Sequence, residues 1–384
     1  MTQNSYICQI IAENPEWRDV ITAKAIKIKE SGSYAIFNYI TFPTVSTEAE
    51  DGNTIKIACD FNDPVVQESR GIIIDTEKAE VVCWPFRKFG NWQESYVDPI
   101  DWNTARVQEK VDGSIVKLWF DKKQNAWTWS TNSVIDANEA EIVPGVSYFH
   151  GISHTPEYRQ IPFDKLDHDC TYIFEFITDL HRIVVKHTMS GLIHTGTRSN
   201  VTGEEFNIDI GIKKPKEYPL HSLDDCVKAA EALNIDASNV TDEGYVVVDA
   251  QWHRIKIKSP QYVYAHHMIS EYTLTKKNVC EVILNAPEQI DELIRINSDA
   301  ERVIRYYQWQ LAEYKFKANA EINKARALYE EFEHDRGAVA KEIKKNKKWA
   351  WFGFKGIGNQ LTADDMLPMM SISNILKDIP DYPL

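Results

Sequence analysis

The character of the sequence changes near residue 265, and this change limits the folds that the chain can adopt. Before it, short runs rich in Val, Ile and aromatic residues alternate with turn residues, as in GIIID at 71–75, SIVKLWF at 114–120 and GYVVV at 244–248. Such runs are typical of β-strands, and a helical stretch at 223–233 lies among them. Residues 1–265 are therefore predicted to form an α+β domain with antiparallel sheets.

Residues 266–384 have a helical pattern instead. Apolar residues recur there at every third or fourth position, at Ile304, Tyr307, Leu311, Tyr314, Ala318, Ile322, Ala325 and Leu328. This spacing predicts one face of a long amphipathic helix, or of two helices in series. A chain of 384 residues is long enough for two domains of about 150 residues each. We expect the second domain to be all-helical and to cover 266–384.

The net charge restricts how the chain can bind a polyanion. Its 43 Lys and Arg residues face 57 Asp and Glu residues, a formal net charge of −14, so it cannot coat nucleic acid by bulk charge. The densest basic segment, KEIKKNKKWAWFGFK at 341–355, holds six Lys and four aromatic residues. It is either a solvated helix end or a nucleic-acid contact, in which Lys meets phosphate and aromatic rings stack on bases.

Cysteine usage and hydropathy indicate the compartment. The six cysteines include no CxxC pair, which favours a reducing compartment without a structural zinc site. The N-terminus lacks the basic region and apolar core of a secretory signal. No apolar run reaches the roughly 18 residues that span a bilayer. We therefore expect a cytoplasmic protein with no membrane partner.

The strongest local motif is KVDGS at 110–114, directly before a strand-like run. On its own it is a common turn beside an exposed Lys. A second feature strengthens the KVDGS signal. EGYVVV at 243–248 and WHRIKIKS at 252–259 predict a hairpin, in which Arg254, Lys256 and Lys258 share one face. Two lysines on such a strand suit a phosphate site, although lysines also protect the edge strand of a sheet.

Further charged residues accompany predicted strands. Glu175 alternates with Phe174 and Phe176, so it is either a satisfied core carboxylate or a ligand to a metal or a sugar hydroxyl. Arg70 precedes one strand and Lys88 follows the next, which predicts another hairpin. Four strand ends thus supply Lys, Arg and Glu to one predicted pocket.

Together these residues resemble the covalent nucleotidyltransferases, which are ATP-dependent ligases and capping enzymes. KVDGS is similar to their motif I, FEF at 174–176 to motif IIIa, EGYVVV to motif IV and RIKIKS to motif V. Across residues 30–265, further stretches resemble the phage-type tRNA-repair RNA ligases, often called RNA ligase 1: ESRGIII at 68–74, RKFGN at 87–91, FEFITDLHRIVV at 174–185 and KIKSPQY at 256–262. The resemblance implies an ATP-grasp-like adenylylation domain followed by an all-helical RNA-recognition domain.

The resemblance also implies a mechanism. Lys110 attacks the α-phosphate of ATP and forms lysyl-AMP, the AMP passes to an RNA 5′-phosphate, and a 3′-hydroxyl displaces it. Lys256 and Lys258 stabilise the α-phosphate and are expected to lower the pKa of Lys110, because like charges disfavour its protonated form.

Ligand contacts follow from the same motifs. The family residues that contact the leaving phosphates or their metal are matched here by Arg70, Lys88 and Tyr262. Glu175 matches the family's glutamate that contacts the ribose. Glu243 matches the carboxylate that positions Mg²⁺, or Mn²⁺ in its place, with Asp112 assisting. The implied partner is RNA, including tRNA with a broken anticodon loop, and we expect a monomer.

One motif departs from the family. The stretch WSTNSVI at 129–135 has no Lys, Arg or Gly where motif III carries a basic residue, so Asn132 or Ser133 substitutes or the ribose contacts differ. Two alternatives stay open: another covalent nucleotidyltransferase, such as a DNA ligase or capping enzyme, and a non-catalytic RNA- or nucleotide-binding module. The first usually continues into a β-rich OB-fold, which residues beyond 270 do not resemble.

Overall fold

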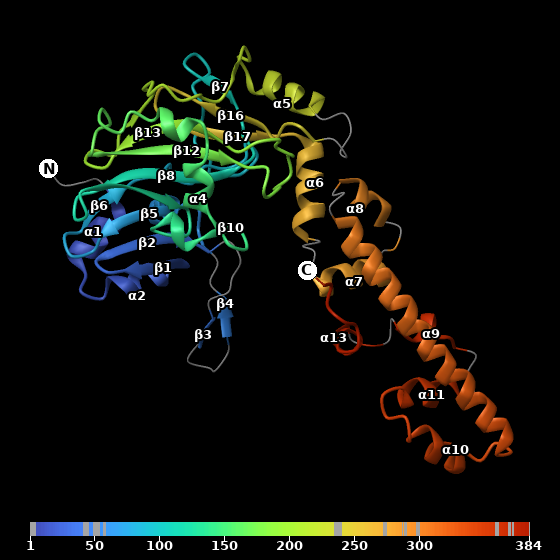
Figure 1. Cartoon of the computed structure of the whole chain (residues 1–384). Helices are drawn as coiled ribbons and strands as arrows, with labels where there is room; N and C mark the ends of the chain where they lie inside the picture. Colours follow the sequence, from blue (N-terminus) through green and yellow to red (C-terminus); the bar gives the residue numbers. More distant parts are fainter. Residues whose placement is uncertain are drawn as a thin grey trace. The chain divides into compact units, whose positions relative to one another are not determined.

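The computed structural model of the chain has a first part of antiparallel sheets and helices and a helical second part (Figure 1). Its described residues are 5–40, 46–48, 54–56, 59–233, 240–271, 275–285, 287, 290–296, 300–357, 361–367, 370 and 372–383. The chain divides into two compact units, Met1–Asp236 with Val240–Val263, and Tyr264–Leu384. The predicted α+β class, with antiparallel sheets followed by helices, is confirmed.

An N-terminal sheet of four antiparallel strands opens the first unit. In spatial order the strands are β1 (Ile26–Ser31), β2 (Tyr34–Tyr39), β5 (Arg70–Asp75) and β6 (Glu80–Cys83). The helices that share its core are α1 (Tyr6–Glu13), α2 (Trp17–Thr22) and α3 (Pro64–Glu68). A separate short hairpin pairs β3 (Ser46–Glu48) with β4 (Thr54–Lys56). The predicted hairpin after Arg70 is therefore present as β5 and β6.

A central sheet of five strands contains the predicted strand of Glu175. In spatial order the strands are β14 (Glu205–Phe206), β13 (Gly191–Ser199), β12 (Cys170–Ile177), β8 (Ser114–Asp121) and β9 (Ala126–Thr131). Phe174 and Phe176 point into its main core, as the alternation predicts. Trp119 on the other face packs with Ile36 and Ile73, so the central and N-terminal sheets share a core. The connections contain α4 (Tyr148–Ser153), β10 (Glu141–Val143), β11 (Val146–Ser147) and short 3₁₀ turns at Ala137–Glu139 and Glu157–Gln160.

An outer sheet of four strands contains the predicted lysine hairpin. In spatial order the strands are β15 (Glu217–Tyr218), β7 (Arg106–Glu109), β16 (Gly244–Val248) and β17 (Arg254–Lys258). Ile255 and Ile257 are 5% and 1% exposed and lie in its core with α5 (Leu223–Ala232). The predicted alternation is confirmed, because Arg254, Lys256 and Lys258 occupy the opposite, more exposed face.

The KVDGS motif joins two of these sheets. Strand β7 belongs to the outer sheet and β8 to the central sheet, so residues 110–113 cross from one to the other. Lys110 N donates to Gly244 O at 2.9 Å, which fixes the start of the crossing on β16. Gly244 has φ +138°, and an added Cβ would lie 2.2 Å from Ile257 O, so only glycine allows this close approach.

The second unit is helical in its described part. Its helices are α6 (Pro260–Glu271, which begins in the first unit), α7 (Lys276–Asn285), α8 (Ile290–Ile296), α9 (Glu301–Glu331), α10 (Arg336–Ile343), α11 (Ala350–Gly356), α12 (Ala363–Met366) and α13 (Ile372–Leu376). The predicted long amphipathic helix is α9, whose predicted apolar positions are buried except for the half-buried Leu328. No described helix of the chain is both long and apolar enough to cross a membrane.

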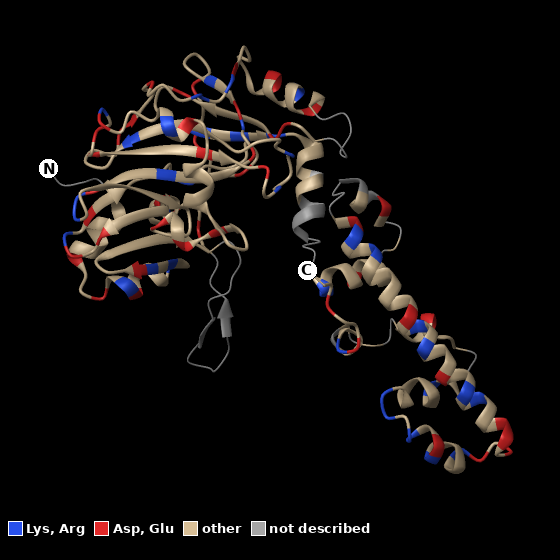
Figure 2. Ribbon diagram, viewed as in Figure 1, with Lys and Arg blue, Asp and Glu red and all other residues tan. Residues whose placement is uncertain are grey.

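The basic segment 341–355 forms the end of α10, the following turn and α11, with Lys residues along the turn (Figure 2). Two of its four aromatic residues, Trp349 and Phe352, pack against Tyr314 of α9. Their ring centres lie 4.7 and 6.1 Å from the centre of the Tyr314 ring. These two rings are therefore not free to stack on bases. Lys345 pairs with Glu342, and Lys348 with Asp378, each at 2.7 Å.

Candidate functional site

A cavity of about 430 Å³ is bordered by the central sheet, the outer sheet and the 110–113 crossing. We call it the lysine cavity. Its charged lining residues are Arg70, Glu109, Lys110, Glu175, Arg254, Lys256 and Lys258. Five cations against two carboxylates favour an anionic ligand.

The structure brings most of the predicted site residues to this cavity or directly behind it. Those that border it are Arg70, Lys110, Glu175, Lys256 and Lys258. Those that lie outside its lining are Lys88, Asp112, Glu243 and Tyr262. A larger cavity of about 530 Å³ elsewhere in the unit is bordered by Cys8, Asp75, Lys122 and His168 and by none of the predicted residues. The chemistry of the lining, not the size of the cavity, therefore identifies the candidate site.

The Lys110 ammonium is held by a buried carboxylate. Lys110 Nζ lies 2.6 Å from Glu243 Oε2, and Lys258 Nζ lies 2.8 Å from Glu243 Oε1. Burial is the largest single influence and would lower the pKa of Lys110. The charges of Glu243, Glu175 and Asp112, with the hydrogen bond to Glu243, together outweigh burial and raise that pKa above its ordinary value. The two ammonium groups in turn lower the pKa of Glu243 despite its burial. The expectation that neighbouring lysines depress the pKa of Lys110 is therefore wrong.

Lys256 has the depressed pKa instead. Burial, with the positive charges of Lys88, Lys110 and Lys258, lowers the pKa of Lys256 to about 7. Its ammonium lies 5.6 Å from the centre of the Phe89 ring. Near neutral pH, Lys256 can thus exist with or without its proton.

Strand β17 is an edge strand of the outer sheet, as the alternative interpretation of its lysines requires. That edge is nevertheless covered where Lys256 lies: Lys256 N donates to Gly90 O at 2.9 Å, and Trp92 N donates to Lys256 O at 3.0 Å. Because backbone already occupies the edge, protection of a bare strand does not account for the lysines.

Glu175 reaches the cavity from β12, opposite Phe174 and Phe176. Burial raises its pKa to about 7, although the Lys110 charge opposes the rise. An added Cβ at Gly113 would lie 2.6 Å from Phe176 O and 3.0 Å from Glu175 Cγ. The glycine of KVDGS is thus required for the crossing to pass this close to Glu175.

Asp112 and Tyr262 are engaged with other parts of the protein. Asp112 Oδ2 accepts hydrogen bonds from Val184 N at 2.9 Å and Val185 N at 2.6 Å, and Oδ1 accepts one from the Tyr262 hydroxyl at 2.9 Å. Burial, with the Glu243 and Asp112 charges, raises the pKa of Tyr262. Both residues thus anchor the crossing against residues 184–185 and the first turn of α6, and three acceptor positions of the Asp112 carboxylate are already occupied within the protein.

Lys88 and Arg70 lie among aromatic rings. Lys88 Nζ is 4.9 Å from the centre of the Phe61 ring and 5.5 Å from that of Tyr96, and burial lowers its pKa. Arg70 Cζ is 5.1 Å from the centre of the Phe89 ring. Lys88 does not line the lysine cavity, yet its charge acts on Lys256, so it contributes to the potential there.

A buried lysine lies beside the stretch that lacks a basic residue. Asn132 and Ser133 border the cavity, and Lys117 of β8, which is fully buried, donates to Gly71 O. A Cβ added at Gly71 would lie 2.9 Å from both Lys117 Nζ and Asn132 O, so the ammonium lies next to Asn132 in the interior. Burial lowers the pKa of Lys117 to about 8. A positive charge close to the 129–135 stretch thus comes from the neighbouring strand β8.

Several residues that line the lysine cavity were not among the site residues predicted from the sequence. Phe86, Phe89, Val246, Arg254 and Thr195 all border the cavity. Phe89 and Val246 lie inside motifs that were recognised, and Arg254 shares the face of Lys256, so strand alternation alone is a signal for it. Nothing in the sequence marks Thr195, which reaches the cavity only through the pairing of β13 with β12.

Three carboxylates lie close enough to Lys110 to act on its pKa, those of Glu243, Glu175 and Asp112. Carboxylate oxygens are hard ligands that suit Mg²⁺, which takes its remaining positions from water and phosphate oxygens. This donor set fits a divalent ion that arrives with a phosphorylated ligand. Among the described residues, no three His, Cys, Asp or Glu side chains form a cluster that could hold a metal ion.

The fold and site define an α+β protein whose cation-rich cavity suits a phosphorylated ligand. A family model described as RNA ligase matches residues 68–262, about half of the chain. The chain therefore belongs to the RNA ligase family, and the predicted membership of the phage-type RNA ligases, within the covalent nucleotidyltransferases, is confirmed.

Relatives match only part of their own length. A putative bifunctional polynucleotide kinase/RNA ligase of Autographa californica nuclear polyhedrosis virus is 28% identical over 273 residues, covering 65% of this chain and 37% of the viral protein. A putative RNA ligase of Thermovibrio ammonificans is 26% identical and covers 54% of this chain and 55% of that protein. A solved archaeal ATP-dependent RNA ligase is 13% identical, with a TM-score of 0.42, over 78% of this chain and 80% of that one.

Proposed function

We propose that the chain is an ATP-dependent RNA ligase that joins RNA 3′-hydroxyl and 5′-phosphate ends through lysyl-AMP and RNA-adenylate. The observation that carries this proposal is the Lys110–Glu243–Lys258 arrangement at the lysine cavity, in which one amine and one carboxylate are 2.6 Å apart beside further cations. An amine so placed can attack a phosphate that the neighbouring cations hold.

The first step transfers AMP to Lys110. Its neutral amine attacks the α-phosphate, so that an N–P bond forms and the bond to pyrophosphate breaks. The amine must give up protons, and Glu243 Oε2, 2.6 Å away, is placed to accept one. Lys256, Lys258 and Arg70 would stabilise charge on the phosphates. Phe89 and Val246 supply an apolar wall for the base, and Glu175 an acceptor for a ribose hydroxyl.

Mg²⁺, or Mn²⁺ in its place, would be held by Glu243 and phosphate oxygens and would neutralise phosphate charge. We assign Asp112 and Tyr262 a positioning role, because each engages the other rather than the cavity. In the later steps an RNA 5′-phosphate takes the AMP and Lys110 regains its amine. A 3′-hydroxyl then attacks that 5′-phosphate, and AMP leaves.

RNA repair is the setting that we propose, with a broken tRNA anticodon loop as one substrate. One relative is named as a polynucleotide kinase joined to an RNA ligase, and a kinase acting on polynucleotide ends supplies the 5′-phosphate that joining consumes. We further propose that the helical residues 266–384 contact RNA, through exposed lysines such as Lys344 and Lys347. We also propose that the protein acts as a monomer in the cytoplasm. In the described part of the chain the six cysteines form no disulfide, which fits a reducing compartment.

A labelled-nucleotide assay tests the proposed function. We expect the protein, incubated with Mg²⁺ and ATP labelled at the α-phosphate, to retain label after denaturation and to join a 5′-phosphorylated single-stranded RNA. Parallel reactions contain GTP or nicked duplex DNA. Label from GTP alone would indicate a capping-type enzyme, and sealing of DNA alone a DNA ligase. RNA binding without label or joining would indicate a non-catalytic module and contradict the proposal.

The low pKa of Lys256 predicts that nucleotide affinity falls as pH rises. Lys256 is protonated below a pKa of about 7, and its charged form binds phosphate more strongly. Above pH 7 the Kd of an ATP analogue with an uncleavable α–β bond should therefore increase, by up to about tenfold per pH unit. Lys256→Arg keeps its charge and should flatten this dependence in a binding titration. The same slope in both proteins would exclude Lys256 as its source.

A further inference from the structure

The β16–β17 hairpin holds a tryptophan in a strained conformation. Trp252 has φ +65°, a left-handed conformation that is unfavourable for a bulky side chain. Such strain persists only where the surroundings enforce it, and it is concentrated at functional sites. Trp252 is half-buried, and it is not part of the outer-sheet core that contains Val107, Tyr245, Ile255 and Ile257. Its conformation is therefore not explained by packing in that core.

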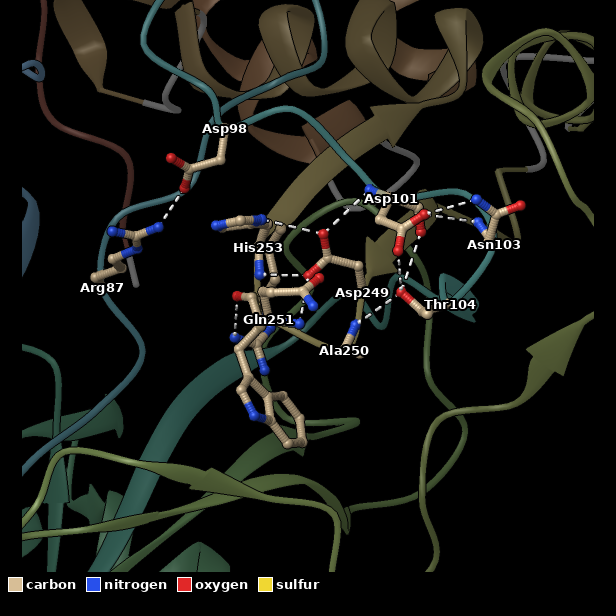
Figure 3. Close-up of polar contacts among 11 residues, drawn as sticks. Arg87, Asp98, Asp101, Asn103, Thr104, Asp249, Ala250, Gln251 and His253 are labelled. Carbon is tan, nitrogen blue, oxygen red and sulfur yellow. Dashed lines mark hydrogen bonds and ion pairs between the residues drawn. The ribbon is translucent and has the colours of Figure 1, made fainter.

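A buried carboxylate enforces the turn (Figure 3). Asp249 Oδ1 accepts from Gln251 N and His253 N, each at 2.9 Å, and Oδ2 accepts from Asp101 N at 3.1 Å. Trp252 N itself donates to Asp249 O at 3.1 Å. These bonds fix the backbone on both sides of Trp252, so the indole is preorganised.

Cations surround the indole. The Arg254 and Arg106 guanidinium carbons lie 5.6 and 5.8 Å from the centre of the Trp252 ring. Trp252 and Arg254 line two small hollows. Lys214 also lines the first hollow, and Arg87 and Lys88 also line the second. Five cations thus line the hollows beside one partly exposed aromatic ring, and three of them, Arg87, Arg106 and Arg254, also pair with the carboxylates of Asp98, Glu217 and Glu205.

This surface is continuous with the lysine cavity. Arg254 lines the cavity and both hollows. An aromatic ring among cations matches single-stranded nucleic acid, whose bases stack and whose phosphates pair with Arg and Lys. Resting on the proposed function, we propose that Trp252 stacks on a base near the RNA end that is presented to the lysine cavity, and that Arg106 and Arg254 contact its flanking phosphates.

The test variant is Trp252→Asn. Asparagine tolerates the left-handed backbone, so the turn should survive, whereas the stacking surface is lost. We expect the Kd of a short 5′-phosphorylated single-stranded RNA, measured by fluorescence anisotropy, to rise about tenfold to hundredfold. Lysyl-AMP formation needs no RNA and should stay within about twofold. Trp252→Phe should recover most of the affinity, and Val20→Asn on α2, another exposed apolar position, should bind RNA normally.

An RNA whose end nucleotides lack their bases isolates stacking from other effects. It should bind the wild-type protein more weakly than intact RNA, but Trp252→Asn should bind both RNAs equally. If intact RNA keeps its advantage in Trp252→Asn, or if that variant binds like the wild type, the stacking role is refuted. If the wild-type protein neither binds RNA nor forms lysyl-AMP, the proposed function itself has failed.

Discussion

Replacement of Lys110 by alanine is expected to abolish the transfer of AMP from ATP to the protein, a loss on the order of 10⁴-fold or more. Lys110 borders the lysine cavity, and Glu243 Oε2 is 2.6 Å from its amine, so nucleophile and proton acceptor are already in contact. The measurement is the labelled protein band that remains after incubation with labelled ATP and Mg²⁺ and denaturation.

A comparison with Lys256 tests whether Lys110, and not another lysine of the cavity, is the nucleophile. By protonation alone Lys256 is the better nucleophile, because its pKa of about 7 leaves much of it neutral, whereas Glu243 holds the proton on Lys110. We nevertheless expect Lys256→Ala only to slow labelling, by about a hundredfold, since its role is to hold phosphate. Lys110→Arg keeps a cation beside Glu243 and should also remain unlabelled. A labelled Lys110→Ala with an unlabelled Lys256→Ala would reverse the two roles.

The alternation of apolar and charged residues in the sequence predicted which way the side chains of the site point. Alternation along β12 and β17 places Glu175 and Lys256 on faces opposite buried Phe and Ile residues, and the structure has the same arrangement. The prediction from alternation succeeds because, in a strand with one buried face, the charged residues must point to the opposite face. The apolar spacing of residues 304–328 likewise predicted helix α9, because a helix with one buried face repeats its apolar residues every three or four positions.

Properties that depend on distant partners were not predictable in this way. The KVDGS motif does not indicate that Asp112 accepts hydrogen bonds from Val184 and Val185, some seventy residues away. Nor do neighbouring lysines predict the pKa of Lys110, because it depends on burial and on the carboxylates of Glu243, Glu175 and Asp112. The strain at Trp252 depends on Asp249, and no propensity scale anticipates it.

Replacement of Glu243 by glutamine is expected to give a large loss of stability. The Glu243 side chain is 3% exposed, and its two partners, Lys110 and Lys258, are 20% and 24% exposed. Removing the shared carboxylate leaves two partly buried ammonium groups without their anion, at a cost of about 3–5 kcal/mol. Chemical denaturation at neutral pH measures this loss. Asp224→Asn removes an exposed helical ion pair and is the matched control, in which no measurable change is expected.

Glu243 should contribute to the free energy of unfolding throughout the neutral pH range. Its pKa is lowered in the folded protein, so its contribution is present above the ordinary carboxylate value and is lost as pH falls through the folded value. The pKa of Lys110 is raised, so its contribution is complete below the ordinary lysine value and is lost as pH rises through the folded value. The stability difference between wild type and Glu243→Gln should therefore narrow at both extremes of pH.

Glu243→Gln should also change the pH dependence of labelling. Wild-type labelling should rise with pH, because more Lys110 becomes neutral as its raised pKa is approached. Without the carboxylate, only the charges of Glu175 and Asp112 still oppose burial and the positive charge of Lys258. The pKa of Lys110 should therefore fall, and the rise in labelling should move to lower pH. The maximal rate should still be lower, since the proton acceptor is missing. A pH profile that keeps its wild-type position would show that Glu243 does not control the protonation of Lys110.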